Sequence, residues 1–331
     1  MRVAVTGATG NVGTSLLHAL AGEPEVEEIV GIARRVPDRA WTKVRWQAAD
    51  VRSDDLVELF RGCSAVVHLA WAIQPSHRQA ELAATNLGGS ARVLEALLAA
   101  GIPSLIHASS VGAYAPGPKH RRVDESWPVT GVRSSFYSRH KARVEDMLDV
   151  FSTEHPGVRV VRMRPGLIFK RGAGSEVAGL FLGPAFGRLV TQRGLIKVVP
   201  SHPRLRVQAV HSRDVAEAYR RAVLADVSGP INVAAEPVVD SHVLGRVFGA
   251  VRVPVPAMAM RLAASALWHA RVQPTPPGWV DLGLAAPLMT TDRAARDLGW
   301  APTVDAASAL AEIVEGMAAR ASEPTPAMAG D

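Results

Sequence analysis

A tyrosine and a lysine placed four residues apart give the clearest chemical signal in this 331-residue chain. They are Tyr137 and Lys141, in the segment Tyr-Ser-Arg-His-Lys. On a helix, this spacing puts both side chains on one face. A free phenol has a pKa of about 10 and is a poor base at neutral pH, but a neighbouring ammonium group favours the phenolate. The pair therefore predicts an acid–base site in which Tyr137 exchanges a proton.

A hydroxyl that could complete this site follows a strand that is expected over residues 104–108. Ser109 and Ser110 come directly after that strand, so a hydroxyl there would face a cleft and bind a substrate oxygen. The serines could instead only cap the end of the strand. Together with Tyr137 and Lys141, Ser110 predicts a catalytic set that polarises a carbonyl group while a proton moves, as hydride transfer requires.

The beginning of the chain combines a buried strand, a glycine-rich turn and a helical pattern. Such glycines let the backbone approach a pyrophosphate, and the helix N-terminus adds free N–H groups and a positive dipole. A dinucleotide site is therefore predicted, with a turn that binds no ligand as the alternative. The expected phosphate contacts are Gly7, Thr9, Gly10, Asn11, Val12 and Gly13.

The expected second strand ends in Ala33-Arg34-Arg35, about 20 residues after the glycine-rich turn. An NAD site places an acid there to bind the ribose 2′-hydroxyl. Ala33 occupies that position, and a following guanidinium could grip a 2′-phosphate through two hydrogen bonds. The sequence therefore predicts NADP, with NAD less favoured. Two surface arginines at the start of a loop are the alternative.

More cofactor contacts are expected where later strands end. Asp50, with Val51 beside it, could accept the adenine amino group, or it could cap a helix that is expected from residue 54. The strand over 65–69 ends in small residues across which a cofactor can lie. The predicted contacts further along the chain are Leu69, Ala70, Trp71, Ser109, Tyr137 and Lys141.

These residues need a scaffold that brings strand ends together, and the hydrophobic pattern supplies one. Strand-like runs at 3–5, 29–32, 45–47, 65–69, 104–108 and 158–162 alternate with helical patterns near 12–21, 54–61, 86–100 and 134–154. This alternation predicts an α/β fold with a doubly wound parallel sheet of Rossmann type. We expect a Rossmann domain over 1–165, to which some later segments return. A smaller mixed α/β substrate-binding region over 166–321 and a disordered tail over 322–331 would follow.

Composition narrows the class of protein further. The net charge is +6, but the arginines are scattered, so an anionic cofactor explains the charge better than nucleic acid. The apolar run at 255–272 contains Arg261, His269 and Arg271; it is too short for a membrane span and is expected to form a core or lid helix. No metal site is expected. The single cysteine and the strand at the very start predict a cytoplasmic protein without a signal peptide.

With these residues the chain resembles the extended short-chain dehydrogenase/reductase superfamily, in its NAD-dependent epimerase/dehydratase branch. The resemblance covers about residues 1–315. Its motifs are TGATGNVG at 6–13, HLA at 68–70, Asn86 with GGS, SSVGAY at 109–114, YSRHK at 137–141, MRPGLIF at 163–169, VHSRDVA at 210–216 and DLGW at 297–300.

The resemblance implies a role for individual residues of this chain. Ser110 would be the catalytic hydroxyl, Tyr137 the acid/base and Lys141 its partner. The resemblance also implies a homodimer formed through the helices near 86–100 and 134–154, and it gives His211 and Asp214 a supporting rather than a catalytic role. It adds three cofactor contacts, namely Asn86, with Pro165 and Leu167 at the nicotinamide end.

Two departures from the family pattern argue against particular classes of reaction. Dehydratases place acids directly after the triad hydroxyl, where this chain has Val111 and Gly112. Nucleotide-sugar epimerases usually have an arginine four residues before His211 to bind the diphosphate, and here that residue is Val207, next to Arg206. Together with the arginine pair after the second strand, the departures favour an NADP(H)-dependent reductase acting on a small molecule.

Two other functions stay open. One is a nucleotide-sugar epimerase, and the other is a non-catalytic NADP-sensing regulator. Residues 179–190 could form an apolar wall of the substrate site, or simply part of a core.

Overall fold

The computed structural model describes residues 1–74, 76–182 and 196–328. Its centre is a parallel sheet in the order β11-β7-β5-β4-β1-β2-β3, and the order reverses between β1 and β4. This confirms the predicted Rossmann-type doubly wound sheet. Its strands are β1 (Arg2–Thr6), β2 (Glu28–Ala33), β3 (Val44–Ala48), β4 (Ala65–His68), β5 (Ser104–Ala108), β7 (Arg159–Pro165) and β11 (Gly229–Val233).

Helices cover both faces of this sheet, because successive strand residues point to opposite sides. Val3 and Val5 of β1 pack with α1 (Asn11–Ala21) and α8 (Ser212–Leu224). Ala4 belongs to the other core, which holds α2 (Val57–Phe60), α4 (Gly89–Ala99) and α5 (Phe136–Glu154). Two apolar cores therefore fix the carboxyl ends of the strands at one edge of the sheet.

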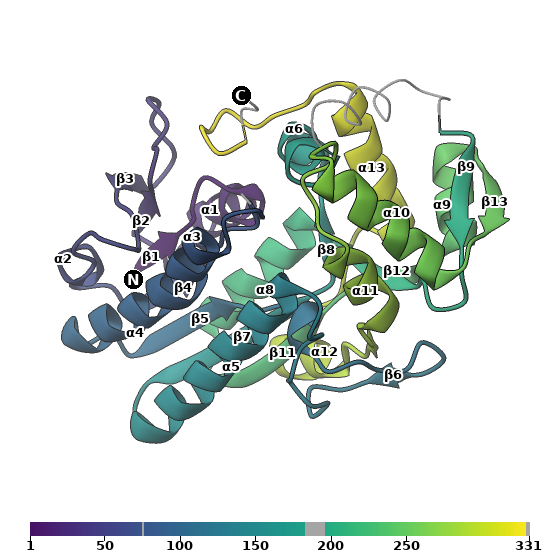
Figure 1. The fold of residues 1–331 in the computed structure, drawn as a ribbon. Helices are drawn as coiled ribbons and strands as arrows, with labels where there is room; N and C mark the ends of the chain where they lie inside the picture. The colour runs from purple at the N-terminus through teal and green to yellow at the C-terminus, as the bar shows by residue number, and fades with distance from the viewer. Residues whose placement is uncertain (75, 183–195, 329–331) are drawn as a thin grey trace.

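Most of the rest of the chain forms smaller sheets and further helices, which Figure 1 shows on one side of the main sheet. The small sheets pair β12-β10-β8, β13-β9 and β14-β6. Their strands are β6 (Arg122–Val123), β8 (Leu167–Phe169), β9 (Val198–Ser201), β10 (Val207–His211), β12 (Ala235–Val239), β13 (Val251–Pro254) and β14 (Leu288–Met289). The remaining helices are α3 (Gln79–Ala83), α6 (Gly174–Val177), α9 (Ser241–Phe248), α10 (Ala257–His269), α11 (Gly278–Ala285), α12 (Asp292–Leu298) and α13 (Ala306–Ala318).

One apolar helix is mostly exposed and does not belong to a core. α10 falls within the run at 255–272 that was expected to form a core or lid helix, but Ala264 is its one buried residue. Met258 and Leu262 on this helix are 63% and 59% exposed. Within the described ranges, no helix combines the length and the apolarity that crossing a bilayer requires.

The segment 322–331, expected to form a disordered tail, is described by the structure up to residue 328. Residues 322–328 follow α13 and return to the glycine-rich turn, where the Thr325 hydroxyl donates to the Thr9 carbonyl at 2.8 Å. Met328 is completely buried beside α1. Contacts with residues far away in the sequence hold this segment, so its small and polar composition did not reveal them. Residues 329–331 lie outside the described part.

Candidate functional site

The glycine-rich turn between β1 and α1 requires glycine for steric reasons. Gly7 has a φ of +70°, in the left-handed region that glycine adopts without strain. A Cβ on Gly13 would lie 2.4 Å from the Gly7 carbonyl oxygen. Gly10 precedes α1 with no side-chain cap, and the first turn of this helix contains no acid. The free N–H groups of this helix end therefore suit an anionic group such as a pyrophosphate.

A pocket of about 420 Å³ opens at this turn, within the size range of small-molecule sites. Most of the predicted cofactor residues lie on its wall: Gly7, Thr9, Gly10, Asn11, Val12, Gly13, Arg34, Arg35, Asp50, Val51, Leu69, Ala70 and Trp71. Sequence reasoning missed further wall residues, among them Gln74, Thr85, Glu176 and Ala327. They come from loops and short helices distant in the sequence, and no motif marks them.

The two arginines after β2 are exposed at the pocket wall. Arg35 donates to the Pro326 carbonyl at 3.0 Å. Among the residues that the structure describes, Arg34 has no hydrogen-bond or ion-pair partner, and its charge lowers the pKa of Asp50. An unpaired guanidinium facing a pocket is suited to a phosphate.

Asp50 is a wall residue and does not cap a helix. α2 begins at Val57, whose N–H group donates to Asp55 at 2.9 Å. The Asp50 carboxylate accepts from the Arg52 guanidinium at 2.7 Å. This hydrogen bond is the main cause that holds the pKa of Asp50 below its usual value. The adenine contact stays a prediction.

Ser110 and Tyr137 meet at the end of β5. The Ser110 side chain accepts a hydrogen bond from the Gly112 N–H group at 3.0 Å, which starts a short turn. A Cβ on Gly112 would lie 2.8 Å from Cε1 of Tyr137, so glycine lets the ring approach this turn. Burial raises the pKa of Tyr137, and its hydrogen bond with Ser110 acts in the opposite direction. The predicted pair of hydroxyls is thus brought together.

Lys141 lies one helical turn after Tyr137 on α5 and is only 3% exposed. Its ammonium group donates to the Ala108 carbonyl at 2.6 Å and lies 3.4 Å from the centre of a Trp71 ring. Burial lowers the pKa of Lys141 to about 7, although the charge of Glu145 opposes this shift. Trp71 also packs its edge against Tyr137, with 6.1 Å between the ring centres. The indole therefore lies between the dinucleotide pocket and the catalytic candidates.

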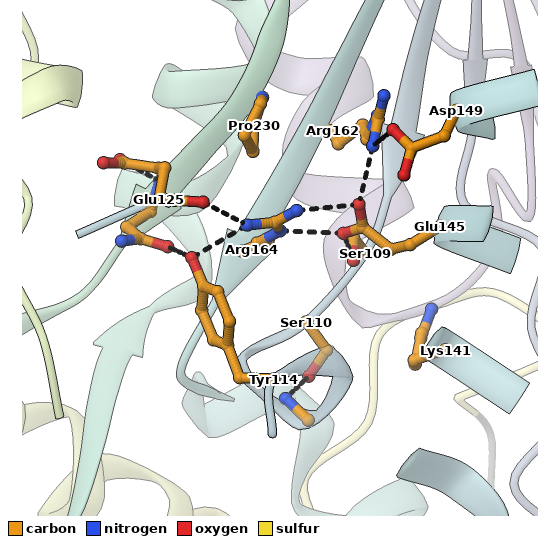
Figure 2. A network of polar contacts seen from close by, with 12 residues as sticks. Ser109, Ser110, Tyr114, Glu125, Lys141, Glu145, Asp149, Arg162, Arg164 and Pro230 are labelled. Carbon is orange, nitrogen blue, oxygen red and sulfur yellow. Dashed lines mark hydrogen bonds and ion pairs between the residues drawn. The ribbon is translucent and has the colours of Figure 1, made fainter. Parts of the chain in front are cut away.

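A buried acid on the same face of α5 ties this helix to the sheet, as Figure 2 shows. Glu145 accepts two hydrogen bonds from the Arg164 guanidinium, both at 2.8 Å. It also accepts one from the Ser109 hydroxyl, while Arg164 donates to the Tyr114 hydroxyl at 3.0 Å. Burial raises the pKa of Glu145, but the contacts with Arg164 and Ser109 outweigh it and keep the pKa below its usual value.

Six predicted cofactor residues are not among the wall residues of this pocket: Tyr137 and Lys141, described above, and Ser109, Asn86, Pro165 and Leu167. Ser109 uses its hydroxyl on Glu145. Asn86 is completely buried and binds the N–H and carbonyl groups of Ala72 at 2.7 and 2.8 Å. It therefore positions the pocket loop and does not line it. Pro165 ends β7, Leu167 in β8 is 41% exposed, and neither belongs to the pocket wall.

The predicted apolar wall is described only in part. Leu180 lines the pocket, and Phe181 packs against Trp279 with 5.0 Å between the ring centres. Residues 183–190, including Phe186, lie outside the described part of the chain. Nothing further is assigned to that segment.

A further acid lines the pocket from α6. One carboxylate oxygen of Glu176 is buried without a hydrogen-bond partner among the described residues. Burial raises the pKa of Glu176 to about 7, and the charge of Lys170 acts in the opposite direction. Lys170 itself donates to the Thr14 hydroxyl at 2.6 Å and pairs with Glu323 at 3.4 Å. The pocket therefore contains a titratable group near the helix end that suits phosphates.

Two supporting residues have the structural role that the family resemblance implied. Asp214 accepts from the Thr303 hydroxyl at 2.6 Å and from the Val304 N–H group at 2.9 Å. His211 caps α8 by accepting from the Arg213 N–H group. Within the described ranges, no three His, Cys, Asp or Glu side chains gather in a way that could hold a metal ion.

Comparisons with known proteins agree with this architecture. The model of the NAD dependent epimerase/dehydratase family matches residues 3–234. UDP-glucose 4-epimerase of Thermus thermophilus, solved in complex with NAD, has a TM-score of 0.69 at 21% identity, and the match covers 96% of this chain and 99% of that one. At this identity, the likeness shows the fold.

Relatives by sequence match this chain over part of their own length. L-arabinose 1-dehydrogenase (NAD(P)(+)) of Haloferax volcanii is 40% identical over 176 residues, which cover 50% of this chain and 66% of that protein. An uncharacterised protein of Mycobacterium tuberculosis is 30% identical over 269 residues, 80% of this chain. The chain spans only about a quarter of that mycobacterial protein, since the match covers 25% of it.

Proposed function

The chain belongs to the NAD-dependent epimerase/dehydratase family of extended short-chain dehydrogenases/reductases, and we propose that it is an NADP(H)-dependent oxidoreductase. It would interconvert a carbonyl compound and its alcohol, with a small molecule as substrate. The observation that carries the proposal is the meeting of Ser110 and Tyr137 at the turn of Gly112, with Lys141 on the next turn of α5.

The chemistry follows from the groups at the end of β5. A bound nicotinamide supplies or accepts the hydride. The Ser110 hydroxyl polarises the substrate oxygen, and Tyr137 donates a proton to that oxygen on reduction or removes it on oxidation. Burial raises the pKa of Tyr137, so the neutral phenol that reduction needs is favoured. The charge of Lys141 would stabilise the phenolate that proton transfer leaves.

Cofactor preference rests on the residues after β2. Ala33 provides no carboxylate for a ribose 2′-hydroxyl, and Arg34 is unpaired among the described residues at the pocket wall. A 2′-phosphate would meet this guanidinium, which supports NADP(H). The Haloferax relative is named for both cofactors, and the Thermus epimerase was solved with NAD. Cys63, which is buried as a free thiol, supports a reducing compartment such as the cytoplasm.

A nucleotide-sugar epimerase is the second candidate, favoured by the similarity in fold to the Thermus UDP-glucose 4-epimerase. Epimerisation needs the diphosphate to stay anchored while the sugar turns between two hydride transfers. Val207, in β10, stands where the family resemblance expects the anchoring arginine. The neighbouring Arg206 donates to the Lys119 carbonyl at 2.7 Å. This residue set favours the oxidoreductase.

Substitution of Tyr137 tests the proposed role most simply. Tyr137→Phe keeps the ring but removes the proton, so turnover of a carbonyl substrate with NADPH should fall at least about 100-fold, while NADPH binding survives. Tyr219→Phe is the matched control, because it removes the hydroxyl of another buried tyrosine, on α8. Near-normal turnover in Tyr137→Phe would show that this tyrosine is not the acid/base.

A further inference from the structure

Residues 322–328, here called the C-terminal strap, form part of the wall of the dinucleotide pocket. Figure 1 shows this segment, in yellow, running from α13 back toward α1. The Thr325 hydroxyl donates to the Thr9 carbonyl of the glycine-rich turn at 2.8 Å, and Ala327 lines the pocket. The strap therefore touches the same turn that would bind the cofactor phosphates.

Buried contacts anchor the strap on both sides of this point. Glu323 forms an ion pair with Lys170 at 3.4 Å. Thr325 is 2% exposed, and Met328 is completely buried. The Thr14 hydroxyl of α1 donates to the Met328 sulfur at 3.7 Å. These anchors hold the backbone between them in a fixed place, and that backbone includes the Pro326 carbonyl.

The Pro326 carbonyl accepts a hydrogen bond from Arg35 at 3.0 Å. Arg35 is otherwise exposed at the pocket wall. A guanidinium has five N–H donors, so this contact leaves donors free for a phosphate. A free surface arginine loses rotamer entropy when it grips a ligand, whereas one already held loses less.

We propose that the C-terminal strap is a specificity-determining part of the cofactor site, which holds Arg35 in place for a 2′-phosphate. The inference rests on the proposed use of NADP(H) and extends it to a segment outside the Rossmann sheet. The strap then strengthens binding of ligands that carry the 2′-phosphate, and hardly affects ligands that lack it.

The test compares adenosine 2′,5′-bisphosphate with 5′-AMP, which differ in the 2′-phosphate alone, by calorimetric titration of the purified chain. The full chain should prefer the bisphosphate. In a chain without residues 322–331, the ratio of the dissociation constants of 5′-AMP and the bisphosphate should fall about three- to ten-fold. This is the gain in affinity expected when one side chain is held in place before the ligand binds. Thr325→Val, which keeps the chain length and loses the contact with Thr9, should shift the preference in the same direction by about two-fold.

Arg35→Ala shows whether the strap acts through this arginine. The preference should fall in Arg35→Ala, and removal of the strap should lower it no further in that background. Arg39→Ala is the charge control, since Arg39 follows the same strand but does not line the pocket. It should leave the preference unchanged.

The outcomes separate the two claims. A full chain that binds both ligands equally overturns the proposed cofactor preference and the strap's role with it. A full chain that prefers the bisphosphate, and keeps that preference in both strap variants, overturns the strap's role alone. An equal loss from strap removal with and without Arg35 would also overturn it.

Discussion

At the scale of single residues, the proposed cofactor preference depends on the two arginines at the pocket wall. Arg34 is the clearest case, because it lies at the pocket wall without a hydrogen-bond partner among the described residues. Its place at the pocket wall was predictable, since the distance from the glycine-rich turn and the absence of an acid at Ala33 are local features. The hydrogen bond from Arg35 to the Pro326 carbonyl could not be predicted, because it joins residues 291 positions apart.

Replacement of Arg34 tests the cofactor preference. Arg34→Ala should weaken NADPH binding about ten- to a hundredfold, the cost of about 1.5–3 kcal/mol for one charge-assisted phosphate contact. NADH binding should change far less, because NADH lacks the 2′-phosphate. Fluorescence titration of both cofactors measures the difference. Equal losses for NADPH and NADH would contradict the assignment.

Glu176 should make cofactor binding depend on pH. Burial raises the pKa of this carboxyl to about 7, so the group is neutral below that pH and negative above it. Lys170, which pairs with Glu323, is the neighbouring cation. A negative charge in the pocket repels an anionic ligand, so the affinity for ADP-ribose should fall about three- to tenfold as the pH rises from about 6 to about 8.

The matched variant for this pH effect is Glu176→Gln. Its amide stays neutral, so the affinity for ADP-ribose should remain near its low-pH value throughout. ADP-ribose lacks the 2′-phosphate, so the titration of that phosphate does not enter. If the variant keeps the pH profile of the unchanged chain, another group causes the dependence.

At the scale of helices and strands, local patterns predicted the parts that position the site. β5 was expected over 104–108, where the structure has it, and α5 over 134–154 corresponds to Phe136–Glu154. Amphipathic periodicity fixes such elements without long-range information. The apolar residues of α10 suggested a place in a core, whereas neighbours from distant segments bury Ala264 and leave Met258 and Leu262 exposed.

The pairing of Glu145 with Arg164 should stabilise the link between α5 and β7. Arg164→Leu removes the bidentate partner of the buried Glu145 carboxylate, so the free energy of unfolding should fall by about 3 kcal/mol. The measurement is urea denaturation followed by circular dichroism. Arg122→Leu is the control, because its ion pair with Glu236 is exposed and should contribute less than about 1 kcal/mol. Equal losses in the two variants would contradict a special role for the buried pair.

At the scale of the whole molecule, one part of the pocket wall could be predicted from local sequence, and the other part depends on contacts between distant segments. The dinucleotide pocket uses the carboxyl ends of β1 and β4, between which the order of the strands reverses, together with that of β2. The wall contributed by α6 and the strap depends on segments far away in the chain, such as Ala327 beside the glycine-rich turn. Local composition at 322–331 suggested disorder because it records none of these contacts.

The reaction itself is the central claim, and one measurement tests it most directly. The purified chain is incubated with NADPH and a panel of ketones and aldehydes, and with catalytic NAD⁺ or NADP⁺ and a panel of nucleotide sugars. Nicotinamide absorbance and chromatographic products are followed in the same samples. We predict one NADPH oxidised for each alcohol formed from a carbonyl substrate, and no change in any nucleotide sugar. An epimerised nucleotide sugar that forms without net consumption of cofactor would contradict the oxidoreductase and establish the epimerase instead.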